Sequence, residues 1–183
     1  QRAFALPLIL PLRLLLLGAG PDAQPLLGLA AQLGWKVSVY DHRPAYADAA
    51  RFLAAERVLL GRPEALSASV DIDSFDAAVI MSHHLQSDAA YLRALASSSV
   101  RYVGLLGPAP RRERLRNLLA EEFAALGARL HSPVGLTLGG RTSASIALGI
   151  VAEIHAWRHG CSARPFAEQA GECRPFRPRS QVA

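Results

Sequence analysis

Short apolar segments alternate along the chain with stretches in which apolar residues recur every three or four positions. Apolar or alternating runs of four to eight residues predict strands, and the longer periodic stretches predict amphipathic helices. Strands are predicted over Arg13–Leu17, Lys36–Tyr40, Val58–Leu60, Ala77–Met81 and Tyr102–Leu106. Helices are predicted over Asp22–Leu33, Tyr46–Ala55, Ser87–Ala96, Pro110–Leu126 and Thr142–His159.

Strands that alternate with helices are typical of βαβ units. Right-handed crossovers then give an α/β fold with an open, doubly wound, mostly parallel sheet and helices on both faces, which is Rossmann-like. In the helix over Pro110–Leu126, Leu118 is expected to face inward together with Leu115 and Leu119. Thr142 is the expected N-cap of the last helix, and Gly160 is its expected end.

Length and composition indicate one globular domain. The chain has 183 residues, of which 51% are hydrophobic and 19% are charged, so it is long enough for a packed core. We expect a linker remnant over 1–11, the Rossmann-like domain over 12–160 and a mobile tail over 161–183. Pro7, Pro11 and Arg13 interrupt the apolar start, so a membrane-spanning helix is not expected there.

The charge is basic but dispersed. The net charge is +5, and Lys36 is the one lysine among 20 basic residues. No basic run interleaved with aromatic residues is present, so we expect no nucleic-acid partner. Cys161 and Cys173 are too few for a disulfide scaffold or a Cys-rich zinc site, which favours a reducing, cytoplasmic setting.

The turn after the first predicted strand reads Gly18-Ala19-Gly20-Pro21-Asp22-Ala23, a G-x-G-x-x-A pattern between a strand and a helix. Gly18 permits the tight turn, and Gly20 lets a pyrophosphate approach the helix N-terminus. Asp41 ends the next strand, where the acid that binds a ribose belongs. The pattern predicts a dinucleotide-type site, and the alternative is that the glycines serve only a strand–helix turn.

Two charged residues leave the ligand open. Asp22 brings a negative charge to the expected phosphate position, and its alternative role is to cap the helix. Asp41 favours a free ribose, whereas Arg43 favours a phosphorylated one. The sequence does not decide between the two.

Two adjacent histidines follow the predicted strand Ala77–Met81. In a doubly wound sheet this strand lies beside the first, so His83 and His84 are expected to face the ligand crevice. No third metal ligand lies near them and Asp88, so we predict no metal site. The catalytic residues are unknown, and His83 is the best candidate. The alternative is that Ser87 caps the next helix and Asp88 offsets its dipole.

Two further turns combine glycine with arginine. Gly107 precedes Arg111 and Arg112, which fall in the first turn of a helix, where cations oppose the helix dipole. A local rule broken beside a crevice favours an anion-binding role. Gly139-Gly140-Arg141 precedes another helix and is a second candidate anion nest. In both turns the alternative is a structural loop with solvated arginines.

These segments in this order resemble the C-terminal Rossmann domain of the XdhC/CoxI family. The resemblance rests on "LLLLGAG", "VYDHR", "AAVIMSHHLQSD", "RYVGLLGPAPRRERL" and "SPVGLTLGGRTSASIALGIVAEIHA". It implies a maturation factor that binds molybdenum cofactor, protects it, aids its sulfuration and delivers it to an apoenzyme such as xanthine dehydrogenase or carbon monoxide dehydrogenase. The implied cofactor is the pterin or its dinucleotide form. The implied partners are the molybdenum hydroxylase, a sulfurtransferase and a second copy of the chain.

The residues that match the family's motifs are Gly18, Gly20, Asp41, His83, Asp88, Gly104, Gly107, Arg111, Gly135 and Gly139. The full candidate set for cofactor binding is Gly18, Gly20, Asp41, Arg43, His83, Asp88, Gly107, Arg111, Arg112, Gly139, Gly140 and Arg141. His84 stands where Asn or Asp is commoner, and Ala109-Pro110 replaces a more basic stretch. The family's N-terminal domain has no counterpart in these 183 residues, so the chain is expected to be a fragment.

Two other functions remain open. One is an NAD(P)-dependent oxidoreductase with His83 as the proton donor, and the other is a nucleotide-sensing regulatory domain. A Tyr-x-x-x-Lys pair is excluded because Lys36 is the sole lysine, and no separate substrate domain follows the sheet. We therefore favour the non-enzymatic maturation factor.

Overall fold

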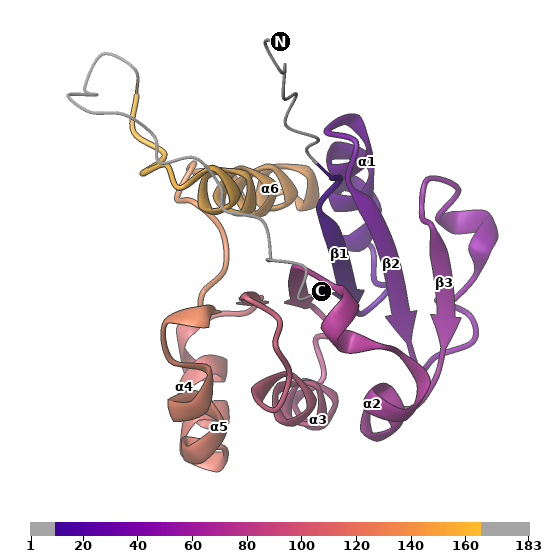
Figure 1. Ribbon diagram of the computed structural model, residues 1–183, viewed down its shortest axis with the longest axis vertical. Coiled ribbons are helices and arrows are strands. Elements are labelled where there is room, and N and C mark those ends of the chain that lie inside the picture. Colours follow the sequence, from indigo (N-terminus) through magenta and orange to yellow (C-terminus); the bar gives the residue numbers. More distant parts are fainter. Residues whose placement is uncertain (1–9, 166–183) are drawn as a thin grey trace, which may run out of the picture.

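The computed structural model describes residues 10–165, and within them six strands form one open parallel sheet in the order β3-β2-β1-β4-β5-β6 (Figure 1). The strands are β1 (Arg13–Leu17), β2 (Lys36–Asp41), β3 (Arg57–Leu60), β4 (Ala77–Ile80), β5 (Tyr102–Leu105) and β6 (Leu130–His131). The helices are α1 (Ala23–Gln32), α2 (Leu66–Ser69), α3 (Leu85–Ala96), α4 (Ala109–Leu118), α5 (Ala120–Leu126) and α6 (Ser143–His159). This order confirms the doubly wound, Rossmann-like sheet.

Helices cover both faces of the sheet, with α1 and α6 on one side and α2, α3, α4 and α5 on the other (Figure 1). In β1, Leu14 and Leu16 pack under α1 and α6, whereas Leu15 and Leu17 pack under α3. Successive side chains of a strand point to opposite faces. A run of four leucines is therefore what a central strand between two helical layers requires.

The segment after β2 departs from the prediction. The helix expected over Tyr46–Ala55 is a single 3-10 turn, Ala49–Arg51. Asp48 has an extended backbone, and its carboxylate accepts a hydrogen bond from the Ala50 N–H. Asp48 therefore caps the start of the turn, which ends where the backbone of Phe52 leaves the helical region (φ −130°, ψ 51°). Further short turns, Pro63–Ala65 and Ile72–Ser74, flank α2 before β4.

The prediction of a single helix over Pro110–Leu126 is also wrong. The backbone of Leu119 leaves the helical region (φ −134°, ψ 47°) and divides the segment into α4 and α5. This break turns Leu119 into the core beside Leu115 and leaves Leu118 exposed, contrary to the predicted inward face. The last helix agrees with the prediction, because Thr142 caps it and Gly160 ends it in the left-handed conformation.

The ends of the chain lie mostly outside the described residues. The predicted linker remnant over 1–11 and tail over 161–183 fall there except for residues 10–11 and 161–165, which carry no regular structure. Cys161 is disulfide-bonded, a state that a reducing compartment does not favour. Between residues 10 and 165, no helix is long and apolar enough to cross a membrane.

Gly18 lets the turn after β1 approach the end of β4 closely. Its φ of +124° is costly for any residue with a side chain, and a Cβ there would lie 2.6 Å from the Met81 carbonyl oxygen. We predict that Gly18→Ala lowers the free energy of unfolding by about 2–4 kcal/mol, because it adds backbone strain to a clash with backbone atoms. Urea denaturation followed by circular dichroism measures the change.

Gly28→Ala is the matched control. A Cβ at Gly28 meets nothing within 4 Å, and the residue lies on the exposed side of α1. The same substitution should therefore stabilise the chain, by about 0.5–1 kcal/mol. Equal effects of the two substitutions would contradict the assigned role of Gly18.

Candidate functional site

The candidate site is the crevice at the carboxyl ends of β1 and β4, where the order of the strands reverses. The chain leaves β1 toward α1 on one face and leaves β4 toward α3 on the other. Such a switch point is where open α/β sheets bind their ligands. The glycine turn, the end of β2, the segment after β4 and the start of α6 meet here through side-chain hydrogen bonds.

Asp41 is a buried carboxylate that the chain itself neutralises. Its side chain is 1% exposed, and its Oδ2 accepts hydrogen bonds from the Ala19 N–H (2.7 Å) and from Arg43 Nη2 (2.7 Å). Its Oδ1 accepts from the Arg43 N–H and from Arg43 Nε, each at 2.9 Å. A carboxylate has about four acceptor positions. The acid that was predicted to bind a ribose therefore has its acceptor positions occupied by groups of its own chain.

The hydrogen bonds at Asp41 decide its protonation. Burial disfavours the charged form, but hydrogen bonds from Arg43 and the Ala19 N–H outweigh it and hold the pKa of Asp41 below its usual value. The same hydrogen bond to Asp41 raises the pKa of Arg43. The guanidinium of Arg43 also lies 3.9 Å from the centre of the Tyr46 ring. Asp41 and Arg43 therefore form a fixed ion pair at the rim of the crevice.

Asp22 links three segments of the crevice and does not cap α1. Its side chain makes no capping hydrogen bond, so the capping role that the sequence offered as an alternative is wrong. Its Oδ1 accepts a hydrogen bond from the Ser143 hydroxyl at the start of α6, and its Oδ2 lies 2.9 Å from His83 Nε2. The negative charge at the expected phosphate position is thus bonded to a hydroxyl and an imidazole of the same chain.

His83 lies beside the glycine turn, as the sequence predicts. Its backbone is left-handed (φ +59°), and its side chain is 52% exposed. A Cβ at Gly20 would have His83 Cδ2, at 3.9 Å, as its one neighbour within 4 Å. Gly20 is itself buried, but the imidazole beside it is half exposed, so solvent and ligand can reach that ring. The left-handed backbone of a non-glycine residue at such a position is typical of functional sites.

Asp88 and Arg111 form a buried ion pair. Asp88 is fully buried, and its Oδ2 accepts from Arg111 Nε (2.9 Å) and Nη2 (2.6 Å). Its Oδ1 accepts from the Ser82 hydroxyl, and Arg111 Nη1 donates to the His83 carbonyl oxygen (3.1 Å). The sequence analysis predicted that Asp88 and Arg111 both bind the cofactor. The structure uses them to hold the segment after β4 against α4.

His84 has a structural role that the prediction gave to Ser87. Helix α3 begins at Leu85, two residues earlier than expected, and the His84 side chain accepts a hydrogen bond from the Ser87 N–H. The His84 ring also lies 3.1 Å from the Ser87 hydroxyl. His84 is therefore an N-cap, and His83 is the histidine that remains available in the crevice.

Arg112 does not belong to the crevice, contrary to the prediction. Its Nε and Nη2 donate to Glu113 Oε1, and its Nη1 donates to the Ser132 carbonyl oxygen at 2.9 Å. Gly107 is structural as well, because its φ of +146° and a Cβ 2.9 Å from Arg111 Cδ leave no room for a side chain. It permits the turn that delivers Arg111 to Asp88.

The loop before α6 presents a third candidate group. Gly139 has a φ of +83° and nothing within 4 Å of a Cβ position, and Arg141 is exposed. Gly140 packs closely on Ser145, where a Cβ would lie 2.3 Å from its side chain. Arg141 stands two residues from Ser143, whose hydroxyl donates to Asp22. The loop therefore brings an exposed cation near the glycine turn.

Two participants had no sequence signal. Ser143 was interpreted only as part of a helix, and its partner Asp22 lies 121 residues away. Glu153 of α6 was not among the candidate residues, yet it accepts hydrogen bonds from the Tyr102 hydroxyl (2.8 Å) and the Gly135 N–H (2.6 Å) and pairs with His131 (3.0 Å). Burial opposes its charge, but these contacts lower the pKa of Glu153. It fixes the base of the loop that carries Arg141.

The crevice lacks the arrangement that nucleophilic catalysis needs. Ser143, Asp22 and His83 are in contact, but the Ser143 hydroxyl donates to the carboxylate and not to the imidazole. In a hydrolytic triad the histidine contacts the serine and serves as its base. Within residues 10–165, no group of three or more His, Cys, Asp or Glu side chains is arranged to hold a metal ion. The exposed basic groups of the crevice, His83 and Arg141, are suited to binding an anion.

Removal of Arg111 should test the buried ion pair. We predict that Arg111→Ala lowers the free energy of unfolding by about 3–5 kcal/mol, because Asp88 then remains buried without a counter-ion. Arg112→Ala, one residue along α4, is the control and should have only a small effect, since its partner Glu113 is exposed. Urea denaturation of both variants gives the comparison, and similar losses would contradict the assignment.

Asp41 should also shape the stability in acid. The pKa of Asp41 is lower in the folded state, so the unfolded chain binds the proton more readily. The stability that Asp41 contributes is therefore complete above about pH 4, the usual pKa of an aspartate. It is lost as the pH falls through the folded pKa. We predict that Asp41→Asn reduces stability at pH 7 and flattens its dependence on pH below about 4. Unfolding free energies of both proteins across this range measure the effect, and parallel curves would refute it.

Comparison with known proteins places this geometry in a family. Residues 14–154 match the XdhC Rossmann domain. A Bacillus subtilis (strain 168) protein described as a probable subunit of xanthine dehydrogenase is 40% identical over 142 residues, which are 78% of this chain and 42% of that protein. A crystal structure of a xanthine dehydrogenase from Bacillus halodurans superposes with a TM-score of 0.74 at 31% identity, covering 87% of this chain and 45% of the other.

The match covers most of this chain but less than half of either relative. The part that is shared is the sheet with its crevice, since residues 14–154 run from β1 into α6. The resemblance seen in the sequence is thereby confirmed. The chain belongs to the XdhC family, and residues 14–154 form its Rossmann domain.

Proposed function

We propose that this chain is a maturation factor that binds molybdenum cofactor, protects it and delivers it to an apoenzyme of the xanthine dehydrogenase or carbon monoxide dehydrogenase type. Membership of the XdhC family favours molybdenum cofactor as the ligand. The hydrogen bonds that Asp41 already accepts argue against NAD(P). In a dehydrogenase the equivalent acid binds ribose hydroxyls. Here its acceptor positions are filled by Ala19 and Arg43. A ligand held by other groups is therefore favoured.

The residues of the crevice fit the phosphate end of a pterin cofactor. Gly139 is exposed and a side chain there would meet nothing within 4 Å, so its backbone is accessible to a ligand. Helices α1 and α6 begin side by side, joined through Asp22 and Ser143, and helix N-termini favour anions. Arg141 adds exposed N–H donors, and His83 adds an exposed ring nitrogen, Nδ1. When bound, the cofactor supplies the molybdenum centre that the target enzyme uses.

Each of these groups has a defined task in the proposal. The backbone of the loop at Gly139 and the guanidinium of Arg141 hold the phosphate. His83 offers its second ring nitrogen, Nδ1, to the ligand, and Asp22 fixes the orientation of the imidazole through Nε2. Exposed groups form weaker contacts than buried ones. Binding at the rim therefore suits a protein that must later release its cargo.

The alternative of an NAD(P)-dependent oxidoreductase rests on His83 as proton donor. The half-exposed imidazole beside Gly20 is compatible with that role. It would also need the ion pair of Asp41 and Arg43 to open, which costs a buried carboxylate its partners. A nucleotide-sensing regulatory domain faces the same requirement. We therefore rank both below the maturation factor.

The remaining expectations follow from the same proposal. The partners are a molybdenum hydroxylase apoenzyme, a sulfurtransferase and a second copy of the chain. The proposed setting is the cytoplasm, where glutathione and thioredoxin would keep the disulfide at Cys161 reduced. Because the chain spans less than half the length of its relatives, delivery to the apoenzyme is proposed for the longer protein of which such a domain is part.

Two substitutions test the assigned cofactor site. We predict that Arg141→Ala and His83→Ala each weaken retention of molybdenum cofactor by about tenfold, the effect of losing one hydrogen bond to a charged group. Anaerobic equilibrium dialysis with the isolated cofactor, followed by pterin fluorescence, measures retention. Arg111 is unsuitable for this test, because its removal leaves the charge of Asp88 buried without a partner and weakens the fold itself.

Arg93→Ala serves as the matched control. Arg93 lies on α3, where it pairs with Glu122, so its replacement removes the same charge at a position away from the crevice. Retention by this variant should equal that of the wild type. If Arg141→Ala and His83→Ala retain the cofactor as well as Arg93→Ala does, the cofactor is not held in this crevice.

A further inference from the structure

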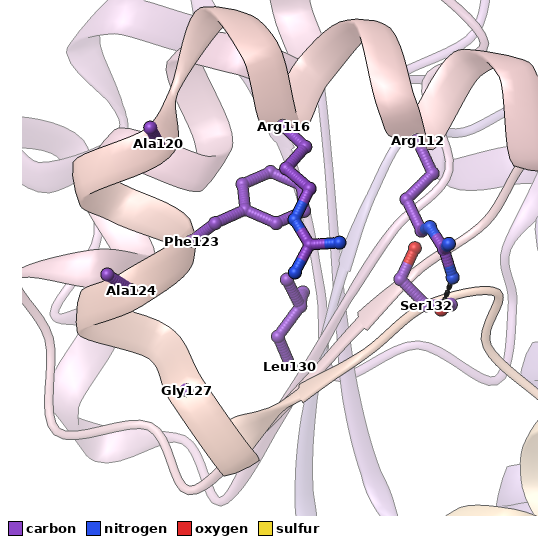
Figure 2. Close-up of a pocket in the computed structure, with 8 residues that line it drawn as sticks. All are labelled: Arg112, Arg116, Ala120, Phe123, Ala124, Gly127, Leu130 and Ser132. Atoms are coloured by element: carbon purple, nitrogen blue, oxygen red, sulfur yellow. Dashed lines mark hydrogen bonds between the residues drawn. The ribbon is translucent and has the colours of Figure 1, made fainter.

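A second candidate binding site lies outside the crevice, between helices α4 and α5 and the edge strand β6 (Figure 2). It is a cavity of about 400 Å³, within the range of small-molecule sites. Arg112 and Arg116 of α4 reach into it, and Phe123 and Leu130 form its apolar wall. Arg111 turns to Asp88 instead, so the cavity and the crevice lie on different sides of α4.

The two arginines of the cavity differ in how they are held. Arg112 is fixed in place by Glu113 and by the Ser132 carbonyl oxygen, and part of its guanidinium remains uncommitted. Arg116 makes no hydrogen bond or ion pair with any residue from 10 to 165, and its guanidinium points into the cavity (Figure 2). Two arginines and one glutamate leave the site with one uncompensated positive charge.

Two features of the cavity are locally unfavourable without a ligand. Arg112 and Arg116 are four residues apart on one helix, where like charges repel. The hydroxyl oxygen of Ser132 is buried in the structure and has no hydrogen-bond partner, although buried polar groups are normally satisfied. An anion between the arginines would relieve the repulsion and could accept from this hydroxyl.

We propose that this cavity binds a carboxylate carried on an aromatic or branched aliphatic group. A planar carboxylate matches the fork of a guanidinium, and a single negative charge matches the single excess positive charge. The apolar group would pack against Phe123 and Leu130, where Gly127 leaves room for it. The carboxylate belongs either to a free small molecule or to the C-terminal end of a polypeptide. This site is additional to the cofactor crevice and does not depend on it.

Titration of the ¹⁵N-labelled chain tests the proposal. Phenylacetate represents the free carboxylate, and N-acetyl-leucyl-phenylalanine represents a chain end. We expect saturable shifts of the amides of residues 112–132 with at least one probe, and the tighter probe identifies the source. Arg116→Gln should weaken that binding by about tenfold or more, since one hydrogen bond to a charged group is lost. Arg116→Lys, which keeps the charge but not the fork, should fall in between.

Two controls make the result decisive. Arg114→Gln removes the same charge from an exposed position of α4 that does not line this cavity, and it should bind as the wild type does. 2-Phenylethanol, which lacks the charge, should produce no saturable shift. The proposal is overturned if neither carboxylate binds, or if Arg116→Gln binds as tightly as Arg114→Gln. Since Arg116 is exposed, all variants should keep the melting temperature of the wild type.

Discussion

The buried carboxylate of Asp41 is the constraint on which the crevice depends. Asp41 ends β2, and it accepts a hydrogen bond from the Ala19 N–H in the turn that follows β1. This bond fixes the carboxyl ends of the paired strands β1 and β2 relative to each other. Gly18, within the same turn, approaches the Met81 carbonyl oxygen too closely for any side chain, which brings β4 into the arrangement. Arg43 completes the neutralisation of the carboxylate. The geometry that a dinucleotide would meet is therefore set by contacts within the chain.

The other acids of the crevice follow the same rule. Asp22 is bonded to His83 and Ser143, and Asp88 to Arg111 and Ser82. Helices α1, α3, α4 and α6 all begin at this edge of the sheet, and their positive dipole ends make internal carboxylates favourable there. With three acids compensated, the exposed basic groups determine what the surface attracts. This is the physical reason to expect an anionic ligand at the rim and not a ribose at Asp41.

The sequence predicts the layers of this fold better than its site. The leucine run of β1 and the periodicity of α6 report burial, which is a local pattern, and both elements have the predicted bounds within a residue. The break at Leu119 and the two-residue strand β6 carry no such pattern, because tertiary packing determines them. In the site, position in the crevice could be predicted for His83 and Asp41. Partners could not, since Asp22 and Ser143 meet across 121 residues and neighbouring Arg111 and Arg112 turn to opposite sides.

The most direct measurement is a titration of the ¹⁵N-labelled chain with NADPH and, separately and anaerobically, with molybdenum cofactor. The amides of Ala19 and Arg43 report on Asp41, and those of residues 139–143 report on the loop before α6. We predict saturable shifts in the loop with molybdenum cofactor and no saturable shift at Ala19 or Arg43 with NADPH. Saturation of the Ala19 and Arg43 shifts by micromolar NADPH would contradict it.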